Sequence, residues 1–267
     1  MTLSANQISD FDQNGFLVFR KLFSEREISI LRLEANRIAD VEAECVVREG
    51  AAGVPKLMLR MHETDGPTGS NIYNATYRLP RVLEPVQQVL QDEALYLHHS
   101  KINMKGAIEG SVWPWHQDFG QWNSDGIERP DLVTFMIMLD EATEFGGCLH
   151  FQPGSHRNGK INPRWDATTT YKFIAMDPDH VKKTLQTGPK PIAITGQPGD
   201  AVLFHCNLLH ASGHNLSAHD RWQVYFCFNR VSNHPHDVPE PRPDYLRSQN
   251  WAPGIPVNED AIISLDS

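Results

Sequence analysis

Residues 95–105, Leu-Tyr-Leu-His-His-Ser-Lys-Ile-Asn-Met-Lys, decide the fold class because the hydrophobic pattern takes a period of two here. Such a period predicts an extended strand whose side chains point alternately to opposite faces. One face carries Tyr96, His98, Ser100, Ile102 and Met104, and the other carries Leu97, His99, Lys101, Asn103 and Lys105. The second face is polar over four successive positions, so the strand either borders solvent at an edge or lines a polar cavity.

Short apolar stretches separated by Gly, Pro, Asp and Asn follow this strand, at residues 132–139, 148–151, 191–195, 201–204 and 222–228. Helices are expected mainly before it. One begins after Ser24, which forms a capping box with Glu27, and buries Ile28, Leu31, Ala35 and Ile38 on one face. A second helix is expected over residues 80–92. This order predicts a mainly β protein with flanking helices, a double-stranded β-helix (jelly roll, cupin-like) in one domain over residues 1–267.

Composition excludes several classes of function. The chain has 24 Lys and Arg against 33 Asp and Glu, a net charge of −9 that would repel a nucleic acid. No apolar run is long enough to span a membrane, and no secretory signal is present, so the protein is expected to be soluble and cytoplasmic. The four cysteines (Cys45, Cys148, Cys206 and Cys227) form no C-x-x-C pair and are expected to be reduced, buried thiols. A homodimer is one option for the oligomeric state.

Metal-binding chemistry is indicated by Trp115-His116-Gln117-Asp118, in which an imidazole and a carboxylate stand two residues apart. On an extended segment both side chains project to one face and can share a metal. The segment 199–210 supplies a third ligand from either His205 or His210. Two histidines and one carboxylate make a facial triad, which suits non-haem Fe(II) and leaves positions open for a co-substrate and dioxygen.

Arg221 lies eleven positions after His210 and could enter the same cavity from the next strand. Its planar guanidinium matches a carboxylate with two hydrogen bonds and stays protonated. Ser212 could donate another bond to the same group. This pair predicts an anchor for the far carboxylate of a dicarboxylic keto acid.

At these positions the sequence resembles the phytanoyl-CoA dioxygenase family of Fe(II)/2-oxoglutarate-dependent oxygenases, and its ectoine hydroxylase branch most closely. The resemblance covers about residues 10–230. It is carried by the segments 100–105 and 115–119, by Trp122 and Asp125-Gly126, and by the turn 153–156. Gly199-Asp200, the segment 206–210, Ser212, Asn215 and Arg221 then follow in the family's order.

The resemblance implies roles for individual residues. His116, Asp118 and His210 would be the iron ligands, with His205 a packed neighbour. Arg221 and Ser212 would anchor 2-oxoglutarate, assisted by Asn103 and Lys105. The candidates for contact with the substrate are Lys101, His99, Trp113, Trp122, Phe204 and Tyr225, together with Arg129. The chain departs from the ectoine hydroxylase branch at Lys101 and His99, where that branch carries Arg and Gln, which leaves the substrate open.

The implied reaction consumes 2-oxoglutarate and dioxygen, forms succinate and carbon dioxide, and hydroxylates an aliphatic C–H bond. Because Asp118 is present, hydroxylation is expected rather than chlorination. Aromatic faces beside Lys and His favour a small zwitterion, such as an amino acid, an ectoine-like compound or an aminoalkylphosphonate. The alternative is a jelly-roll metal protein without oxygenase activity, either a cupin-like isomerase or a sensor. Residues 50–78 are the candidate lid, with an ordinary surface loop as the other reading.

Overall fold

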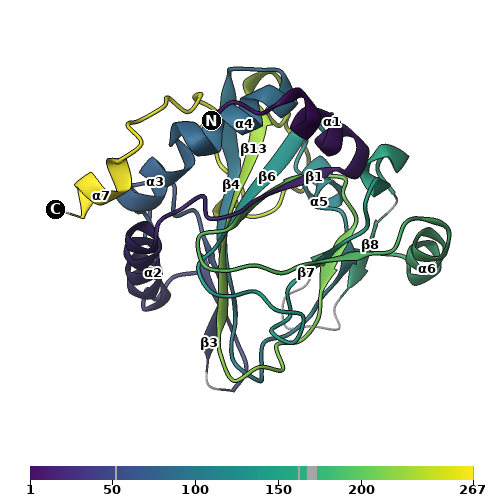
Figure 1. Cartoon of the computed structure of the whole chain (residues 1–267), viewed down its shortest axis with the longest axis horizontal. Coiled ribbons are helices and arrows are strands. Elements are labelled where there is room, and N and C mark those ends of the chain that lie inside the picture. Colours follow the sequence, from purple (N-terminus) through teal and green to yellow (C-terminus); the bar gives the residue numbers. More distant parts are fainter. Residues whose placement is uncertain (52, 162, 167–172, 267) are drawn as a thin grey trace.

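In this computed structural model, which describes residues 1–51, 53–161, 163–166 and 173–266, two antiparallel sheets of seven and four strands form the body of the protein (Figure 1). The larger sheet has the strand order β1-β11-β6-β13-β4-β3-β2 and the smaller has the order β10-β7-β12-β5. A separate hairpin, β8-β9, stands beside the smaller sheet, since β9 contacts β5. The predicted two-sheet architecture is therefore confirmed for these residues.

The seven strands of the larger sheet are, in spatial order, β1 (Phe16–Phe19), β11 (Ala201–His205), β6 (Leu132–Met138), β13 (Arg221–Arg230), β4 (Leu95–Lys105), β3 (Val54–Leu59) and β2 (Val46–Glu49). The smaller sheet contains β10 (Ile192–Ile194), β7 (Leu149–Phe151), β12 (His210–Ser212) and β5 (Trp113–His116), and the hairpin joins β8 (Pro163–Asp166) to β9 (Phe173–Met176). Every apolar stretch expected to be a strand is one.

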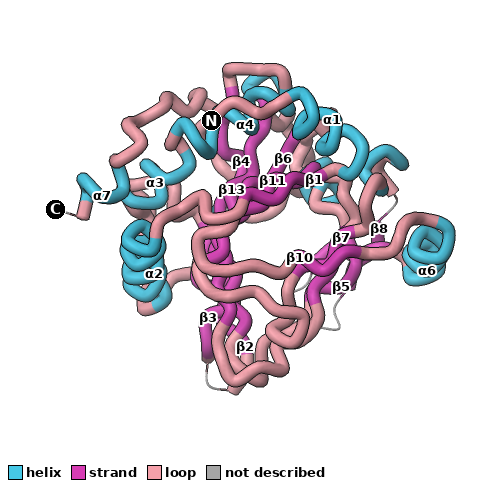
Figure 2. Tube along the Cα trace, in the orientation of Figure 1, coloured by secondary structure: helices cyan, strands magenta, loops and turns pink. Residues whose placement is uncertain are grey.

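Helices cover the outer face of the larger sheet (Figure 2). They are α1 (Ala5–Asn14), α2 (Glu25–Ala39), α3 (Asn71–Tyr77), α4 (Pro80–Leu90) and the C-terminal α7 (Ala261–Leu265). Ser24 caps α2 through the predicted box with Glu27, and Leu31 on its buried face is fully enclosed. Two further helices, α5 (Phe119–Ser124) and α6 (Pro178–Thr187), follow β4 and β5 in the chain, where the sequence pattern indicated no helix.

The inner faces of the two sheets pack on each other. Met136, Phe204 and Tyr225 of the larger sheet share one apolar cluster with Leu149 and Phe151 of the smaller sheet. This cluster fills one part of the space between the sheets, and buried polar side chains occupy another part. The core therefore gives the polar side chains a rigid and largely dry surrounding.

Strand β4 differs from the pattern predicted for residues 95–105 in its exposure and in its register. β13 and β3 pair with its two edges, and the side chains on both of its faces are almost all buried, so the interpretation as a solvated edge is wrong. Its pairing with β13 shifts between Cys227–His99 and Phe228–Leu97, which leaves His98 as an extra residue. Leu97 therefore lies on the apolar face with Ile102, and not on the polar face with His99 and Lys101 as predicted.

The candidate lid is not a loop. Residues 54–59 form β3, which pairs with β4 inside the larger sheet, and Asn71–Tyr77 form α3. Leu57, Met58 and Met61 are buried, so the glycines of this segment mark turns between ordered elements. Both readings of residues 50–78, a lid and a surface loop, are wrong for most of the segment.

After β13 the chain runs mostly without regular secondary structure, interrupted by two short 3₁₀ turns, η2 (Val231–Asn233) and η3 (Asp244–Leu246), and by α7. Another 3₁₀ turn, η1 (Ser155–Asn158), follows β7. All four cysteines are buried and unpaired, as expected. Among the helices of the described chain, none has both the length and the apolarity needed to cross a membrane.

Candidate active site

His116, Asp118 and His210 form a buried cluster at one end of the smaller sheet, each with about 5% of its surface exposed. His116 on β5 and His210 on β12 are direct neighbours across the strand pair, with ring centroids 4.1 Å apart. Asp118 lies just beyond β5, at the start of α5, and not on a strand as predicted. One ligand atom from each residue lies within 4.8 Å of the others, which is compatible with a single metal ion between them.

Backbone carbonyls fix the orientation of both imidazoles. His116 Nδ1 lies 2.7 Å from the carbonyl oxygen of Pro114, and His210 Nδ1 lies 2.8 Å from that of Leu208. A carbonyl only accepts, so each Nδ1 carries the proton and each Nε2 keeps a lone pair. These Nε2 atoms lie 3.6 and 3.9 Å from Asp118 Oδ1. The donor set and tautomers therefore fit a divalent metal such as Fe(II).

Electrostatics favour the ligating protonation states. Burial, followed by the nearby His116, lowers the pKa of His210 to about 3. Burial alone would raise the pKa of Asp118, but His210, His116 and Lys101 outweigh it and lower that pKa. The cluster thus presents a neutral His210 imidazole beside an ionised Asp118 carboxylate.

Arg221 is buried at the start of β13, opposite Lys105 of β4. Its Nη1 donates to Gln223 Oε1, while its Nε lacks a hydrogen-bond partner. Ser212 Oγ, Asn103 Oδ1 and Gln223 Nε2 are likewise buried without partners. Since buried polar atoms are normally paired, so many unpaired atoms between the sheets indicate a ligand that supplies the missing donors and acceptors.

Lys105 links this region to Ser212, because its Nζ donates to the carbonyl of Gly213. Its side chain is about 1% exposed. Burial, then Arg221 and Lys56, lower the pKa of Lys105 to about 6. Arg221 and Lys105 therefore lie close enough for the charge of one to disfavour that of the other, and a dianionic ligand would offset this repulsion.

The remaining predicted residues divide into two groups. Lys101 Nζ lies 5.2 Å from the ring centre of Tyr225 and 6.0 Å from that of Trp113, so these three residues lie together beside the cluster. Trp122 and Phe204 are nearly enclosed in apolar clusters, Phe204 with its ring 5.4 Å from that of His210.

His99 is buried with Nδ1 unpartnered, and the charges of Lys101 and Asp118 both act on it. His205 packs on His156 and Phe11, as a neighbour of the site and not a member of the cluster. Arg129 is half-exposed and pairs with Asp131, and its contact with the substrate stays a prediction.

Three contributions were missed from the sequence. Gln223 bonds both Arg221 and the Tyr225 hydroxyl. Lys56, from the segment taken for a lid, lies 5.0 Å from the Trp113 ring centre and pairs with Glu49 at 2.8 Å. Arg242, from the C-terminal segment, donates to both carboxylate oxygens of Asp125 after α5. Only Gln223 offered a signal, since it follows Arg221 by two on a strand and shares its face.

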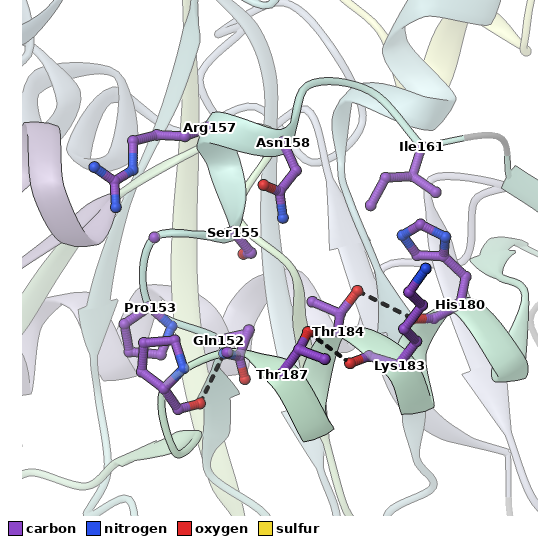
Figure 3. A pocket seen from close by; sticks show the side chains of 13 residues that line it. Gln152, Pro153, Ser155, Arg157, Asn158, Ile161, His180, Lys183, Thr184 and Thr187 are labelled. Atoms are coloured by element: carbon purple, nitrogen blue, oxygen red, sulfur yellow. Dashed lines mark hydrogen bonds between the residues drawn. The ribbon is translucent and has the colours of Figure 1, made fainter.

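A cavity of about 400 Å³ lies between η1 and α6 (Figure 3). Gln152, Ser155 and Asn158 line one wall of this cavity, and Thr184 and Thr187 line the other. None of the cluster residues borders it.

Comparison with known proteins agrees with this geometry. Residues 11–222 match the sequence profile of the family Phytanoyl-CoA dioxygenase (PhyH). The chain is 31% identical to L-proline trans-4-hydroxylase of Streptomyces griseoviridis, over 94% of this chain and 95% of that protein. It is 29% identical to ectoine dioxygenase of Nocardia farcinica, over 93% of this chain and 86% of that protein.

Among solved structures, EctD from S. alaskensis with 2-oxoglutarate and 5-hydroxyectoine superimposes with a TM-score of 0.82 at 26% identity, covering 96% of this chain and 88% of that one. EctD with bound Fe gives a TM-score of 0.83 at the same identity and coverage. The predicted jelly-roll fold, cofactors and hydroxylase class are thereby confirmed, and the alternative without oxygenase activity is set aside. The chain belongs to the phytanoyl-CoA dioxygenase (PhyH) family and is an Fe(II)- and 2-oxoglutarate-dependent dioxygenase.

Proposed function

We propose that His116, Asp118 and His210 hold Fe(II) and that Arg221, with Ser212, anchors the distal carboxylate of 2-oxoglutarate. The observation that carries this assignment is the convergence of two imidazoles and one carboxylate within 4.8 Å, with each imidazole turned toward Asp118 by a backbone carbonyl. Three protein ligands leave the remaining iron positions for co-substrate and dioxygen.

The unpaired atoms between the sheets support the co-substrate assignment. Arg221 Nε and Ser212 Oγ can each donate a hydrogen bond, and Lys105 reaches the adjacent Gly213. No carboxylate in the described parts of the chain lies within 4 Å of Arg221 or Lys105 as an ion-pair partner. A bound dicarboxylate would supply that missing negative charge.

When bound, Fe(II) with 2-oxoglutarate and dioxygen supplies the oxidation: the co-substrate loses carbon dioxide to become succinate, and one oxygen atom enters a C–H bond of the substrate. The protein's residues orient the co-substrate and exclude water from the site. Arg221 and Ser212 fix one end of the co-substrate, Gln223 holds Arg221 in place, and the apolar cluster around Phe204 keeps the adjacent space dry.

We propose that the substrate is a small cyclic amino acid or a similar zwitterion. Lys101 Nζ lies 6.0 Å from the Trp113 ring centre and 5.2 Å from the Tyr225 ring centre, so one region offers an ammonium group for a carboxylate and aromatic faces for a cationic ring nitrogen. His99 adds a buried polar atom without a partner. The hydroxylases named above act on L-proline and on ectoine, which are both cyclic and carry a carboxylate beside nitrogen. Direct contact of Trp122 and Phe204 with the substrate remains a prediction.

The test is a substrate panel. Anaerobically purified protein receives Fe(II), 2-oxoglutarate and air together with L-proline, L-pipecolate, ectoine or 2-aminoethylphosphonate. The expected result is that a cyclic carboxylate raises succinate formation and gains the mass of one oxygen atom. Preferential turnover of the phosphonate, or of none of the four compounds, would contradict the substrate class without affecting the dioxygenase assignment.

We also propose that residues 1–267 form one domain. In support, residues from the N-terminal segment, the larger sheet and α7 contribute to a single apolar cluster. A cytoplasmic location and a homodimer remain predictions.

A further inference from the structure

Gln117 stands between His116 and Asp118, but its side chain does not belong to the metal cluster. It is about 2% exposed and makes three hydrogen bonds. Nε2 donates to the carbonyls of Asn207 at 2.8 Å and Gly159 at 3.0 Å, and Oε1 accepts from the Ile161 amide at 2.9 Å. Its amide group is therefore fully engaged with two loops that come from elsewhere in the chain.

The first of these loops leads directly to the remote ligand. Asn207 is followed by Leu208, whose carbonyl holds Nδ1 of His210 at 2.8 Å. The bond from Gln117 to the Asn207 carbonyl thus ties the residue between two ligands to the turn that orients the third. This tie crosses from β5 to the segment that precedes β12.

The second loop supports the same segment from the other side. Gly159 and Ile161 follow η1, and Ser155 at the start of η1 accepts a hydrogen bond from the Leu209 amide at 2.9 Å. The backbone N–H of Gln152 also donates to the Leu209 carbonyl at 3.0 Å. Leu209, the residue before His210, is consequently fixed by the segment 152–155. Gln117 fixes Gly159 and Ile161, which follow η1.

We infer that Gln117 is a positioning residue that sets the spacing between the His116–Asp118 pair and His210, and thereby the affinity of the site for its metal. This inference rests on the proposed function. Replacing a side chain that holds metal ligands in place, without touching the metal, commonly changes metal affinity by roughly 10- to 100-fold. Gln117 acts here through backbone carbonyls and not through the ligand rings themselves.

A purely structural role is the competing explanation, and the chain offers a matched control. Asn229 is also fully buried, donates through Nδ2 to the Tyr96 hydroxyl at 3.0 Å and to the Asn233 carbonyl at 2.8 Å, and accepts from Asn233 Nδ2 at 2.9 Å. It therefore makes the same number of donated and accepted bonds as Gln117. None of its partners is a cluster residue or adjoins one in sequence.

The experiment compares Gln117→Met and Asn229→Leu, which keep side-chain volume and remove the amide. Fe(II) affinity is measured by anaerobic calorimetry without 2-oxoglutarate, and the visible spectrum of the Co(II)-loaded protein reports coordination geometry. Both variants are expected to lower the melting temperature. Only Gln117→Met is expected to weaken Fe(II) binding, by about 10- to 100-fold, and to shift the Co(II) bands.

Gln117→Glu serves as the second variant if the methionine variant does not fold. It keeps the shape and the bond from Ile161 but turns an oxygen toward two carbonyls, so the same loss of Fe(II) affinity is expected. Wild-type Fe(II) affinity and Co(II) bands in a folded Gln117 variant would overturn the positioning role, as would equal losses in Asn229→Leu. Failure of the wild-type protein to bind Fe(II) would instead contradict the proposed function.

Discussion

Replacing Arg221 by Met tests how the protein holds its co-substrate. Arg221 is about 2% exposed, and its Nη1 donates a hydrogen bond to Gln223 Oε1. Methionine fills much of the same volume but removes the charge and the donors. Because a buried guanidinium without a carboxylate partner is costly, the ligand-free variant should fold at least as stably as the wild type.

The loss of affinity follows from the bonds removed. A hydrogen bond to a charged group contributes about 1.5–3 kcal/mol, so a carboxylate held by two such bonds loses about 3–6 kcal/mol. At 1.4 kcal/mol for each factor of ten, the Kd for 2-oxoglutarate should rise about 10²- to 10⁴-fold. Arg221→Lys keeps the charge but not the planar fork, and should lose roughly one of the two bonds, about 10- to 100-fold.

The assay is anaerobic calorimetry of 2-oxoglutarate into Fe(II)-loaded protein, with Fe(II) affinity measured separately. Arg230→Met is the matched control, since Arg230 ends the same strand and donates to the Leu90 carbonyl. It should leave the affinity for 2-oxoglutarate unchanged. The assignment is refuted if folded Arg221→Met binds 2-oxoglutarate within about threefold of the wild type, a difference well below the loss of one charged hydrogen bond.

Three other predictions concern the same region. The pKa of Lys105 is lowered to about 6 from its ordinary 10.5, so the folded chain holds this amine neutral between these values while the unfolded chain protonates it; ligand-free stability should therefore rise with pH in this range. A bound dianion favours the ammonium form of Lys105, so the affinity of the wild type for 2-oxoglutarate should fall above about pH 6, by up to about tenfold per pH unit. Calorimetry from pH 5.5 to 8.5 should show this fall, and Lys105→Met should show a flat profile. Asp118→Ala should abolish Fe(II) binding in equilibrium dialysis while Asp131→Ala retains it; strong binding by the Asp118 variant would rule out this carboxylate as a ligand. Asp125→Asn removes the ion pair between Asp125 and the mostly buried Arg242, which should cost about 3–5 kcal/mol in denaturant unfolding and speed proteolysis of residues 234–250, with 2-oxoglutarate affinity intact. Unchanged stability and cleavage would show that this pair does not hold the segment.

Much of the architecture could be predicted from the sequence because local rules act on short segments. The capping box at Ser24 placed α2, and apolar stretches with turn residues placed the central strands. The metal cluster was accessible for a similar reason, since His116 and Asp118 are neighbours in sequence. The choice of His210 over His205 required the family resemblance, because both histidines follow the apolar stretch 201–204 in the sequence.

Other features depend on contacts that spacing does not encode. The extra residue His98 in β4 exists only in its pairing with β13, and it moves Leu97 to the opposite face. The glycines around residues 50–69 indicated a loop, whereas pairing with β4 made residues 54–59 a buried strand. Arg242 reaches Asp125 across more than a hundred residues, and no periodicity could indicate that ion pair.

The most direct test of the central claim is 2-oxoglutarate turnover by protein reconstituted with Fe(II), with L-proline and ectoine supplied separately. The account predicts succinate formation that requires Fe(II) and dioxygen together and is lost in both Asp118→Ala and Arg221→Met. Succinate formation that persists in folded Asp118→Ala would contradict the assignment of this cluster as the site of catalysis.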